Sequence, residues 1–129
     1  MTIQSSSGAG FRACSTADGA ARKFELRDRC LNYDVSDGLK AGVRQAVADD
    51  LEEGHRTFLF DLGRVEEVDS SGVGILIAVH HQVVAEGGTV AFIGCCPQVT
   101  KVLQMMRLDK FLALFPDEEK ALRALVERC

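Results

Sequence analysis

Residues 68–74 of this 129-residue chain read Val68-Asp69-Ser70-Ser71-Gly72-Val73-Gly74. They follow a compact apolar run at residues 57–60, and a long apolar segment begins at Gly72. A carboxylate, two adjacent hydroxyls and a glycine between two apolar runs predict an exposed turn that enters a helix. The hydroxyls would then lie at the positive end of a helix dipole, where a phosphate group is tolerated.

On both sides of this turn, the hydrophobic pattern alternates between short apolar runs and amphipathic segments. The runs predict strands at residues 23–31, 57–62, 89–93 and 111–115. Helices are predicted from a cap at Ser36 or Asp37 to Leu51, at residues 71–86, from Pro97, and from Pro116-Asp117 onward. This order predicts an α/β sandwich with a partly parallel sheet.

The first part of the chain has a different composition. Residues 1–21 are rich in Ser, Gly and Ala, which predicts a flexible arm that contributes at most one edge strand. Residues 22–129 are expected to form one domain, because their length suffices to bury a core.

Composition argues against two kinds of partner. The net charge is −4 and the basic residues are scattered, which argues against nucleic-acid binding. No apolar run reaches the roughly 18 residues of a membrane span. The first residues lack the charged-then-apolar layout of a secretory signal, so we expect a cytoplasmic protein.

Metal, redox and enzyme signatures are also missing from the sequence. The five cysteines form no C-x-x-C pair, and we expect reduced thiols; they are Cys14, Cys30, Cys95, Cys96 and Cys129. His80 and His81 are adjacent and therefore form a poor metal pair, and Met105-Met106 suits core packing. Without a phosphate-binding loop, a dinucleotide fingerprint or a nucleophile elbow, we expect no catalysis, no cofactor and no metal.

The helix after the turn is more apolar than burial on one side requires. A helix packed on a sheet needs an apolar stripe of only about 100°. We therefore expect Ile75 and Val79 to form an exposed patch for a partner. The same patch would also suit a homodimer.

The order of elements and the turn together resemble the STAS domain family, and within it the single-domain anti-sigma factor antagonists of bacteria. The resemblance covers about residues 24–127. Its strongest part is residues 58–62 leading into residues 68–74, and a second part is residues 87–93 followed by Pro97-Gln98-Val99. It implies a STAS-like α/β sandwich with a mixed sheet of four to five strands and about four helices.

The resemblance also implies a role in transcription regulation. Such an antagonist binds, when unphosphorylated, an anti-sigma factor that is also a GHKL-type serine kinase, and this frees the sigma factor. The kinase phosphorylates the first serine of the motif, which is Ser70 here, and the complex dissociates. A PP2C-like phosphatase restores the binding form, and the antagonist itself performs no chemistry.

The residue types of the turn suit that scheme. Ser70 is the expected phosphate acceptor and Ser71 the second choice, because Ser71 is expected to cap the helix. Asp69 would lie beside the hydroxyl, and Gly72 and Gly74 would let a partner approach the backbone. The expected partner-binding residues are Asp69, Ser70, Ser71, Gly72, Val73, Gly74, Ile75 and Val79.

Other functions remain open from the sequence alone. The turn could be an ordinary helix cap in which both serines only satisfy backbone amides. The chain could be a STAS subunit of another assembly, such as a lipid-transport complex beside an ABC ATPase or a stressosome-like scaffold. It could also be a small module that senses a nucleotide or a lipid. The stretch Arg29-Cys30-Leu31-Asn32-Tyr33-Asp34 departs from the family, whose antagonists usually carry a glycine before a Leu-Asp pair here.

Overall fold

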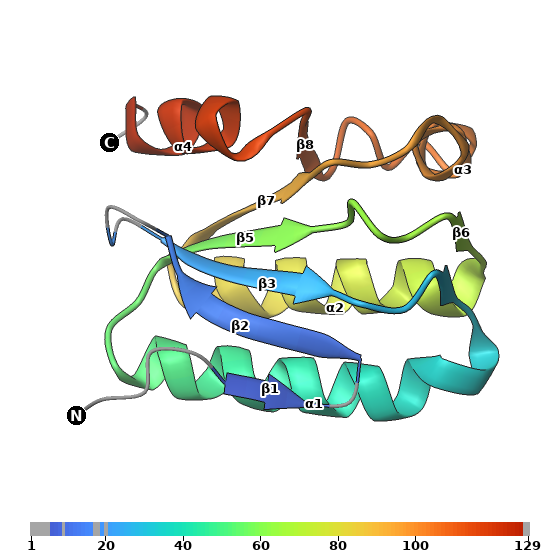
Figure 1. Ribbon diagram of the computed structural model, residues 1–129. Helices are drawn as coiled ribbons and strands as arrows, with labels where there is room; N and C mark the ends of the chain where they lie inside the picture. The colour runs from blue at the N-terminus through green and yellow to red at the C-terminus, as the bar shows by residue number, and fades with distance from the viewer. Residues whose placement is uncertain (1–5, 9, 17–18, 20, 128–129) are drawn as a thin grey trace.

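Four short strands come first in the described part of the chain, and helices separated by short strands follow (Figure 1). The computed structural model describes residues 6–8, 10–16, 19 and 21–127. The elements are β1 (Ser6–Gly8), β2 (Phe11–Ser15), β3 (Arg22–Leu26), β4 (Cys30–Leu31), α1 (Tyr33–Glu52), β5 (Thr57–Asp61), β6 (Glu67–Val68), α2 (Ser70–Ala85), β7 (Thr89–Ile93), α3 (Pro97–Met105), β8 (Ala113–Phe115) and α4 (Glu118–Glu127).

The main sheet is mixed, as the sequence predicts. Its strand order is β1-β2-β3-β5-β7-β8, with antiparallel pairing from β1 to β3 and parallel pairing from β3 to β8. Helices α1 and α2 cover one face of the sheet, and α4 lies on the other (Figure 1). The α/β class and the four helices are therefore confirmed.

The central strands are buried on both faces because their side chains alternate between two cores. Phe58 and Phe60 of β5 pack on the side of α1 and α2, whereas Leu59 packs with Ala121 and Leu125 of α4. The rings of Phe24, Phe60 and Phe92 follow one another across three strands, with centroids 5.0 and 5.6 Å apart. Burial of each such side chain contributes about 1.5–3 kcal/mol.

Two predictions about the strands are wrong. The predicted strand at residues 23–31 is divided into β3 and β4, and β4 pairs in parallel with β6 in a separate two-stranded sheet. The N-terminal segment supplies two strands, β1 and β2, and not at most one edge strand, and with them the main sheet has six strands. The second difference arises because Phe11 and Ala13 alternate inward and are buried in the core.

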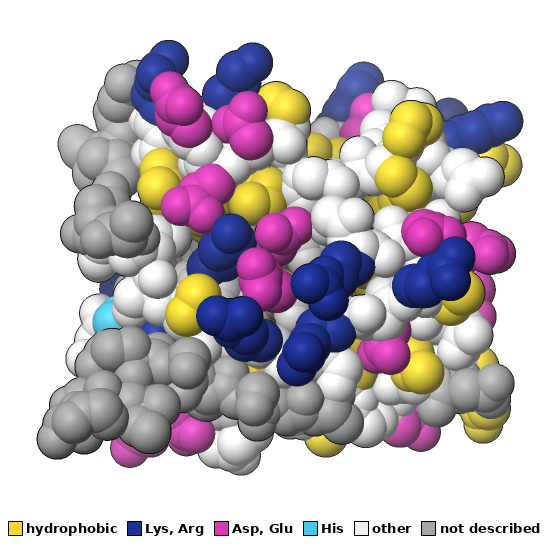
Figure 2. All heavy atoms as spheres, in the orientation of Figure 1, with side chains coloured by type: hydrophobic (Ala, Val, Ile, Leu, Met, Phe, Trp, Pro, Cys, Tyr) yellow, Lys and Arg dark blue, Asp and Glu magenta, His cyan; other side chains and the backbone are white. Residues whose placement is uncertain are grey.

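The surface carries charges of both signs. On the face shown in Figure 2, Lys and Arg side chains lie among Asp and Glu side chains. This mixture agrees with the scattered basic residues of the sequence. Among the described residues, no helix is long and apolar enough to cross a membrane.

Candidate functional site

Asp69 follows strand β6 and caps helix α2. Its backbone is extended (φ −109°, ψ −173°), and its Oδ1 accepts a hydrogen bond from the Gly72 N–H at 3.0 Å. The expectation that Ser71 caps the helix is therefore wrong. The helix begins at Ser70, one residue earlier than predicted, because the carboxylate of Asp69 supplies the acceptor for a first-turn amide.

The two serines of the motif occupy the first two positions of α2. Ser70 is exposed and Ser71 is half-buried. Neither hydroxyl makes a hydrogen bond to any described residue. Since Asp69 satisfies the turn, the Ser70 hydroxyl is left accessible at the positive end of the helix.

The two glycines of the motif have different roles. Gly72 is buried. A Cβ atom on residue 72 would overlap the carbonyl oxygen of Leu31, and it would lie 2.6 Å from the Cβ of Leu31 and 2.7 Å from Cγ2 of Val68. Gly72 therefore lets α2 pack on β4 and β6, which is a structural reason for a glycine at this position. Gly74 is half-buried with nothing within 4 Å of its Cβ position, so its surface is open.

Three of the predicted contact residues are inaccessible. Val73, Ile75 and Val79 are each 1% exposed or less and belong to the main core. The prediction of an exposed patch at Ile75 and Val79 is wrong because α2 packs against both the sheet and α1, which buries more of its circumference than a single sheet would. The homodimer expected through that patch loses its basis as well.

An aromatic side chain that the sequence analysis did not select lies at the same end of the molecule. Tyr33 is the first residue of α1 and is 75% exposed. Its backbone N–H donates to Oδ2 of Asp69 at 3.3 Å, so it is next to the candidate turn. Asn32, one residue earlier, caps α1: its Oδ1 accepts from the Val35 N–H at 3.4 Å and its carbonyl accepts from the Ser36 N–H at 3.0 Å, so the helix begins at Tyr33 and not near Ser36. The available signal was an aromatic residue in a polar stretch directly before a predicted helix.

The loop before β6 is held by Arg29. The guanidinium forms two hydrogen bonds with the carboxylate of Glu66, at 3.0 and 3.1 Å, and the Arg29 carbonyl accepts from the backbone N–H groups of Glu66 and Glu67. The hydrogen bond with Arg29 lowers the pKa of Glu66, and the same hydrogen bond with Glu66 raises the pKa of Arg29. Behind this loop lies a cavity of about 200 Å³ lined by residues 30–32 and 67–69.

A cluster of three rings lies farther along α2. The His80 ring is 4.4 Å from the Phe111 ring, and the His81 ring is 5.7 Å from it. His80 is half-buried and His81 is exposed, as expected for adjacent helix positions. Nδ1 of His80 is buried and has no hydrogen-bond partner among the described residues. Burial, and to a smaller extent the nearby charge of His81, lowers the pKa of His80.

The methionine prediction fails, and the cysteine prediction holds for the described residues. Met105 and Met106 are 73% and 45% exposed, because α3 directs its Val99–Leu103 stripe to the core instead. The thiols of Cys14, Cys30, Cys95 and Cys96 are free, and Cys129 lies outside the described residues. Burial raises the pKa of Cys95 to about 11, which leaves its thiol protonated at neutral pH.

One group of side chains has the composition of a metal site. Asp50, Glu53 and His55 each bring one potential ligand atom within 4.8 Å of the others. The Asp50 carboxylate already accepts from Nε of Arg22 at 2.9 Å. The guanidinium therefore supplies the countercharge of the buried carboxylate, and the turn after α1 accounts for the position of the other two groups.

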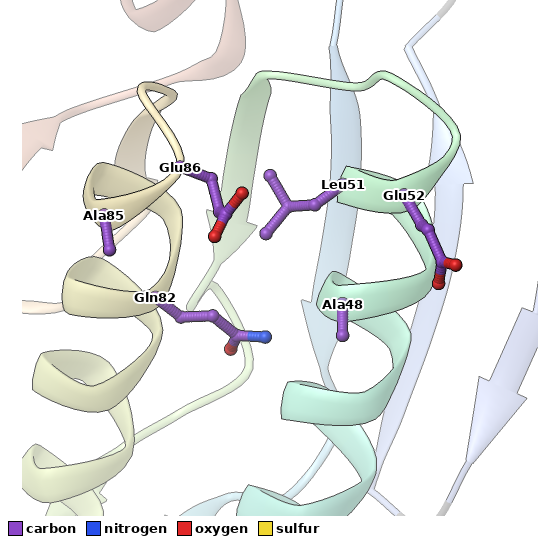
Figure 3. A pocket seen from close by; sticks show the side chains of 6 residues that line it. All are labelled: Ala48, Leu51, Glu52, Gln82, Ala85 and Glu86. Carbon is purple, nitrogen blue, oxygen red and sulfur yellow. The ribbon is translucent and has the colours of Figure 1, made fainter.

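A second hollow lies between the C-terminal halves of α1 and α2 (Figure 3). Its volume is about 370 Å³, and it is lined by Ala48, Leu51, Glu52, Gln82, Ala85 and Glu86. In this view Gln82 and Glu86 extend from α2 toward α1. Because the candidate turn is at the N-terminal ends of both helices, this hollow is separate from it.

The fold and the turn together define a small α/β module with an accessible serine at the capped end of a buried helix. The chain belongs to the STAS domain family, whose model matches residues 31–121. That range contains the turn and three of the four helices.

Solved structures share the fold at low sequence identity. An anti-sigma-factor antagonist (STAS) domain protein from Planctomyces limnophilus is 20% identical, with a TM-score of 0.77 over 90% of this chain and 97% of that one. The anti-sigma factor antagonist SpoIIAA in its unphosphorylated form is 21% identical, with a TM-score of 0.67 over 88% and 95%.

Two further structures bear on function. SpoIIAA, a Bacillus cell fate determinant, also matches in its phosphorylated form, at 20% identity and a TM-score of 0.62 over 88% of this chain and 98% of that one. A sulfate transporter family protein from Wolinella succinogenes is 19% identical, with a TM-score of 0.68 over 88% and 97%. The same fold therefore occurs in proteins of different roles.

Proposed function

We propose that this protein is an anti-sigma factor antagonist in a phosphorylation-controlled partner switch. The unphosphorylated protein binds an anti-sigma factor that is also a GHKL-type serine kinase. Phosphorylation of Ser70 releases that partner, and a PP2C-like phosphatase restores binding. Because the switch consumes ATP, it would operate in the cytoplasm.

The observation that carries the proposal is that Asp69 caps the helix and thereby leaves the Ser70 hydroxyl accessible. Asp69 caps the helix through its carboxylate, whereas the exposed Ser70 hydroxyl makes no hydrogen bond to the described residues. A kinase can therefore reach this hydroxyl without breaking the turn. Ser71 is half-buried and is the weaker candidate.

The likeness to SpoIIAA supports the same reading. That protein is an anti-sigma factor antagonist with structures in an unphosphorylated and a phosphorylated form. Both forms match this chain over 88% of its length, which indicates that the shared fold accommodates either state.

The chemistry is a phosphoryl transfer in which the protein is the substrate. Ser70 Oγ forms a bond to the γ-phosphorus of ATP, the bond from that phosphorus to the bridging oxygen breaks, ADP leaves, and the hydroxyl proton is released. The product carries about −1.5 to −2 charges at pH 7. The helix N-terminus stabilises that charge, so the domain stays folded, and the docked partner is released through repulsion and desolvation.

The test is phosphorylation by the candidate kinase. The wild-type protein, Ser70→Ala and Ser71→Ala are incubated with the kinase and ATP, and phosphate is mapped by mass spectrometry. We expect modification at Ser70 in the wild type and in Ser71→Ala, and none in Ser70→Ala. Modification at Ser71, or at no serine of the turn, would contradict the proposal.

Binding gives the second measurement. We expect Ser70→Asp to bind the kinase at least roughly tenfold more weakly than the wild type, a difference of about 1.4 kcal/mol. Ser70→Ala, which removes the hydroxyl without adding charge, is the matched control and should bind like the wild type. Equal binding by Ser70→Asp and the wild type would exclude the switch.

A second candidate is a STAS subunit of another assembly. The likeness to the sulfate transporter family protein favours it, because that protein has the same fold. In such an assembly the turn would be a packing contact. A complex that survives Ser70→Asp, isolated with an affinity-tagged chain, would support this candidate over the switch.

A further inference from the structure

The carboxylate of Asp69 is shared by two helices. Its Oδ1 accepts from the Gly72 N–H of α2 at 3.0 Å, and its Oδ2 accepts from the Tyr33 N–H of α1 at 3.3 Å. The first amides of a helix have no partner within the helix and carry its positive dipole end. One side chain therefore stabilises two helix N-termini that lie at the same end of the molecule (Figure 1).

The backbone around this carboxylate forms a single hydrogen-bonded unit. The Asp69 N–H donates to the Leu31 carbonyl at 3.1 Å, and Leu31 pairs with Val68 between β4 and β6. Gly72 leaves no room for a Cβ beside Leu31, so the first turn of α2 lies directly on the strand that leads into α1. A displacement of Asp69 is thus transmitted to Tyr33 over two short hydrogen-bonded paths.

Tyr33 has the properties of an interface anchor. It is the most exposed of the large apolar side chains among the described residues, at 75%. Aromatic residues are enriched among the side chains that dominate binding energy at protein interfaces. The cavity of about 200 Å³ that Asn32 and Asp69 help to line lies beside it, so the surface offers both a projection and a recess.

We propose that Asp69 couples Ser70 to Tyr33, and that Tyr33 is an aromatic contact for the anti-sigma factor kinase that binds this turn. This inference rests on the proposed function. Phosphate on Ser70 places a like charge next to Asp69, and both anions compete for the first-turn amides of α2. Asp69 is displaced and Tyr33 loses the acceptor for its N–H, so the residue that carries the exposed ring is held less firmly, whereas Asn32 still caps the rest of the first turn of α1.

Amide hydrogen exchange measures the coupling directly. In the wild type we expect the exchange of the Tyr33 amide to accelerate roughly tenfold on phosphorylation, as loss of one hydrogen bond of about 1–1.5 kcal/mol requires. Asp69→Asn retains an acceptor oxygen for Gly72 but turns an amide N–H₂ group toward Tyr33. In that variant the Tyr33 amide should exchange rapidly in both states. A Tyr33 exchange rate that phosphorylation leaves unchanged in the wild type would overturn the coupling.

Binding tests the contact. We expect Tyr33→Ala to bind the kinase roughly tenfold or more weakly, with the free energy of unfolding unchanged because the side chain is exposed. Val84→Ala is the matched control, since Val84 is 49% exposed near the opposite end of α2, and it should bind like the wild type. Equal affinities for Tyr33→Ala and the wild type would exclude Tyr33 as a contact.

The two proposals fail in different ways. If the wild type neither binds the kinase nor accepts phosphate at Ser70, the proposed function fails and this inference fails with it. If the wild type does both, and Tyr33→Ala binds equally well, only the contact fails. Phosphorylation of Ser70 in Tyr33→Ala at high kinase concentration would verify that the variant is folded.

Discussion

At the scale of single residues, Gly72 and Gly74 provide a sharp comparison. We expect Gly72→Ala to lower the free energy of unfolding by about 1–3 kcal/mol, because its Cβ would overlap the Leu31 carbonyl and crowd Val68. Gly74→Ala should raise it by about 0.5–1 kcal/mol, because a helix-interior glycine with open space gains helix propensity. Urea unfolding of both variants provides the measurement.

The outcome also bears on how the motif is understood. Equal stability of the Gly72→Ala and Gly74→Ala variants would contradict the close packing of α2 on β4 at Gly72. If Gly74→Ala alone weakened partner binding while stabilising the fold, Gly74 would be a point of contact.

At the scale of elements, the ring cluster joins α2 to the segment after α3. Burial first and His81 second lower the pKa of His80. Because this folded-state pKa lies below that of the unfolded chain, about 6.5, the unfolded state binds the proton more readily. The contribution of His80 to stability is therefore complete above about pH 6.5 and is lost as the pH falls through its folded-state pKa.

A substitution at His80 tests that relation. We expect His80→Leu to lose less stability than the wild type between about pH 7 and about pH 5, measured by urea unfolding at both pH values. His81→Gln removes only the smaller cause and should give an intermediate result. If the wild type and His80→Leu lost the same stability over this pH range, the folded state would not disfavour protonation of His80.

Two ion pairs between elements differ in environment. Arg22 of β3 and Asp50 of α1 are 2.9 Å apart with side chains 8% and 10% exposed, whereas Arg29 and Glu66 are 75% and 55% exposed. We expect Asp50→Asn to lower the free energy of unfolding by about 3 kcal/mol, because it replaces the carboxylate of a buried ion pair with a neutral amide. Glu66→Gln should cause no measurable change. Urea unfolding of the two variants measures both changes. Equal losses of stability in Asp50→Asn and Glu66→Gln would contradict the difference between the buried and the exposed ion pair.

At the scale of the whole molecule, the N-terminal hairpin is part of the core. Phe11 is 3% exposed, and its ring stacks on Phe24 with centroids 5.8 Å apart. We expect Phe11→Ala to lower the free energy of unfolding by about 3–5 kcal/mol. Arg12→Ala, on the outer side of the same strand, should have little effect. A chain that tolerates Phe11→Ala would have a detachable N-terminal arm, as the composition of residues 1–21 suggested.

The elements whose signals lie within their own segment were predicted correctly from the sequence. The strand at residues 89–93 and the helix from Pro97 follow from runs and caps contained within each segment, and their predicted positions match the structure. The serine motif was also placed correctly at the start of α2, although the short strand β6 before it was not predicted.

The errors occurred where the decisive partner is distant in sequence. The Tyr33 N–H, at the start of α1, has its acceptor in Asp69, which is 36 residues away. Ile75 and Val79 are buried because α1 covers a side of α2 that a helix on a sheet would leave open. Phe11 lies among small residues, and its burial depends on pairing with β3.

In the turn, the residues that stabilise the fold differ from the residue that is the proposed phosphate acceptor, and this affects how such proteins diversify. Asp69 and Gly72 hold the scaffold, whereas the Ser70 side chain forms no hydrogen bond with the described residues. Under the proposed function, a single codon change at Ser70 would therefore remove or restore the switch without a cost to folding. Regulated and constitutive descendants could arise repeatedly from one ancestral scaffold, and selection on folding would not oppose either course.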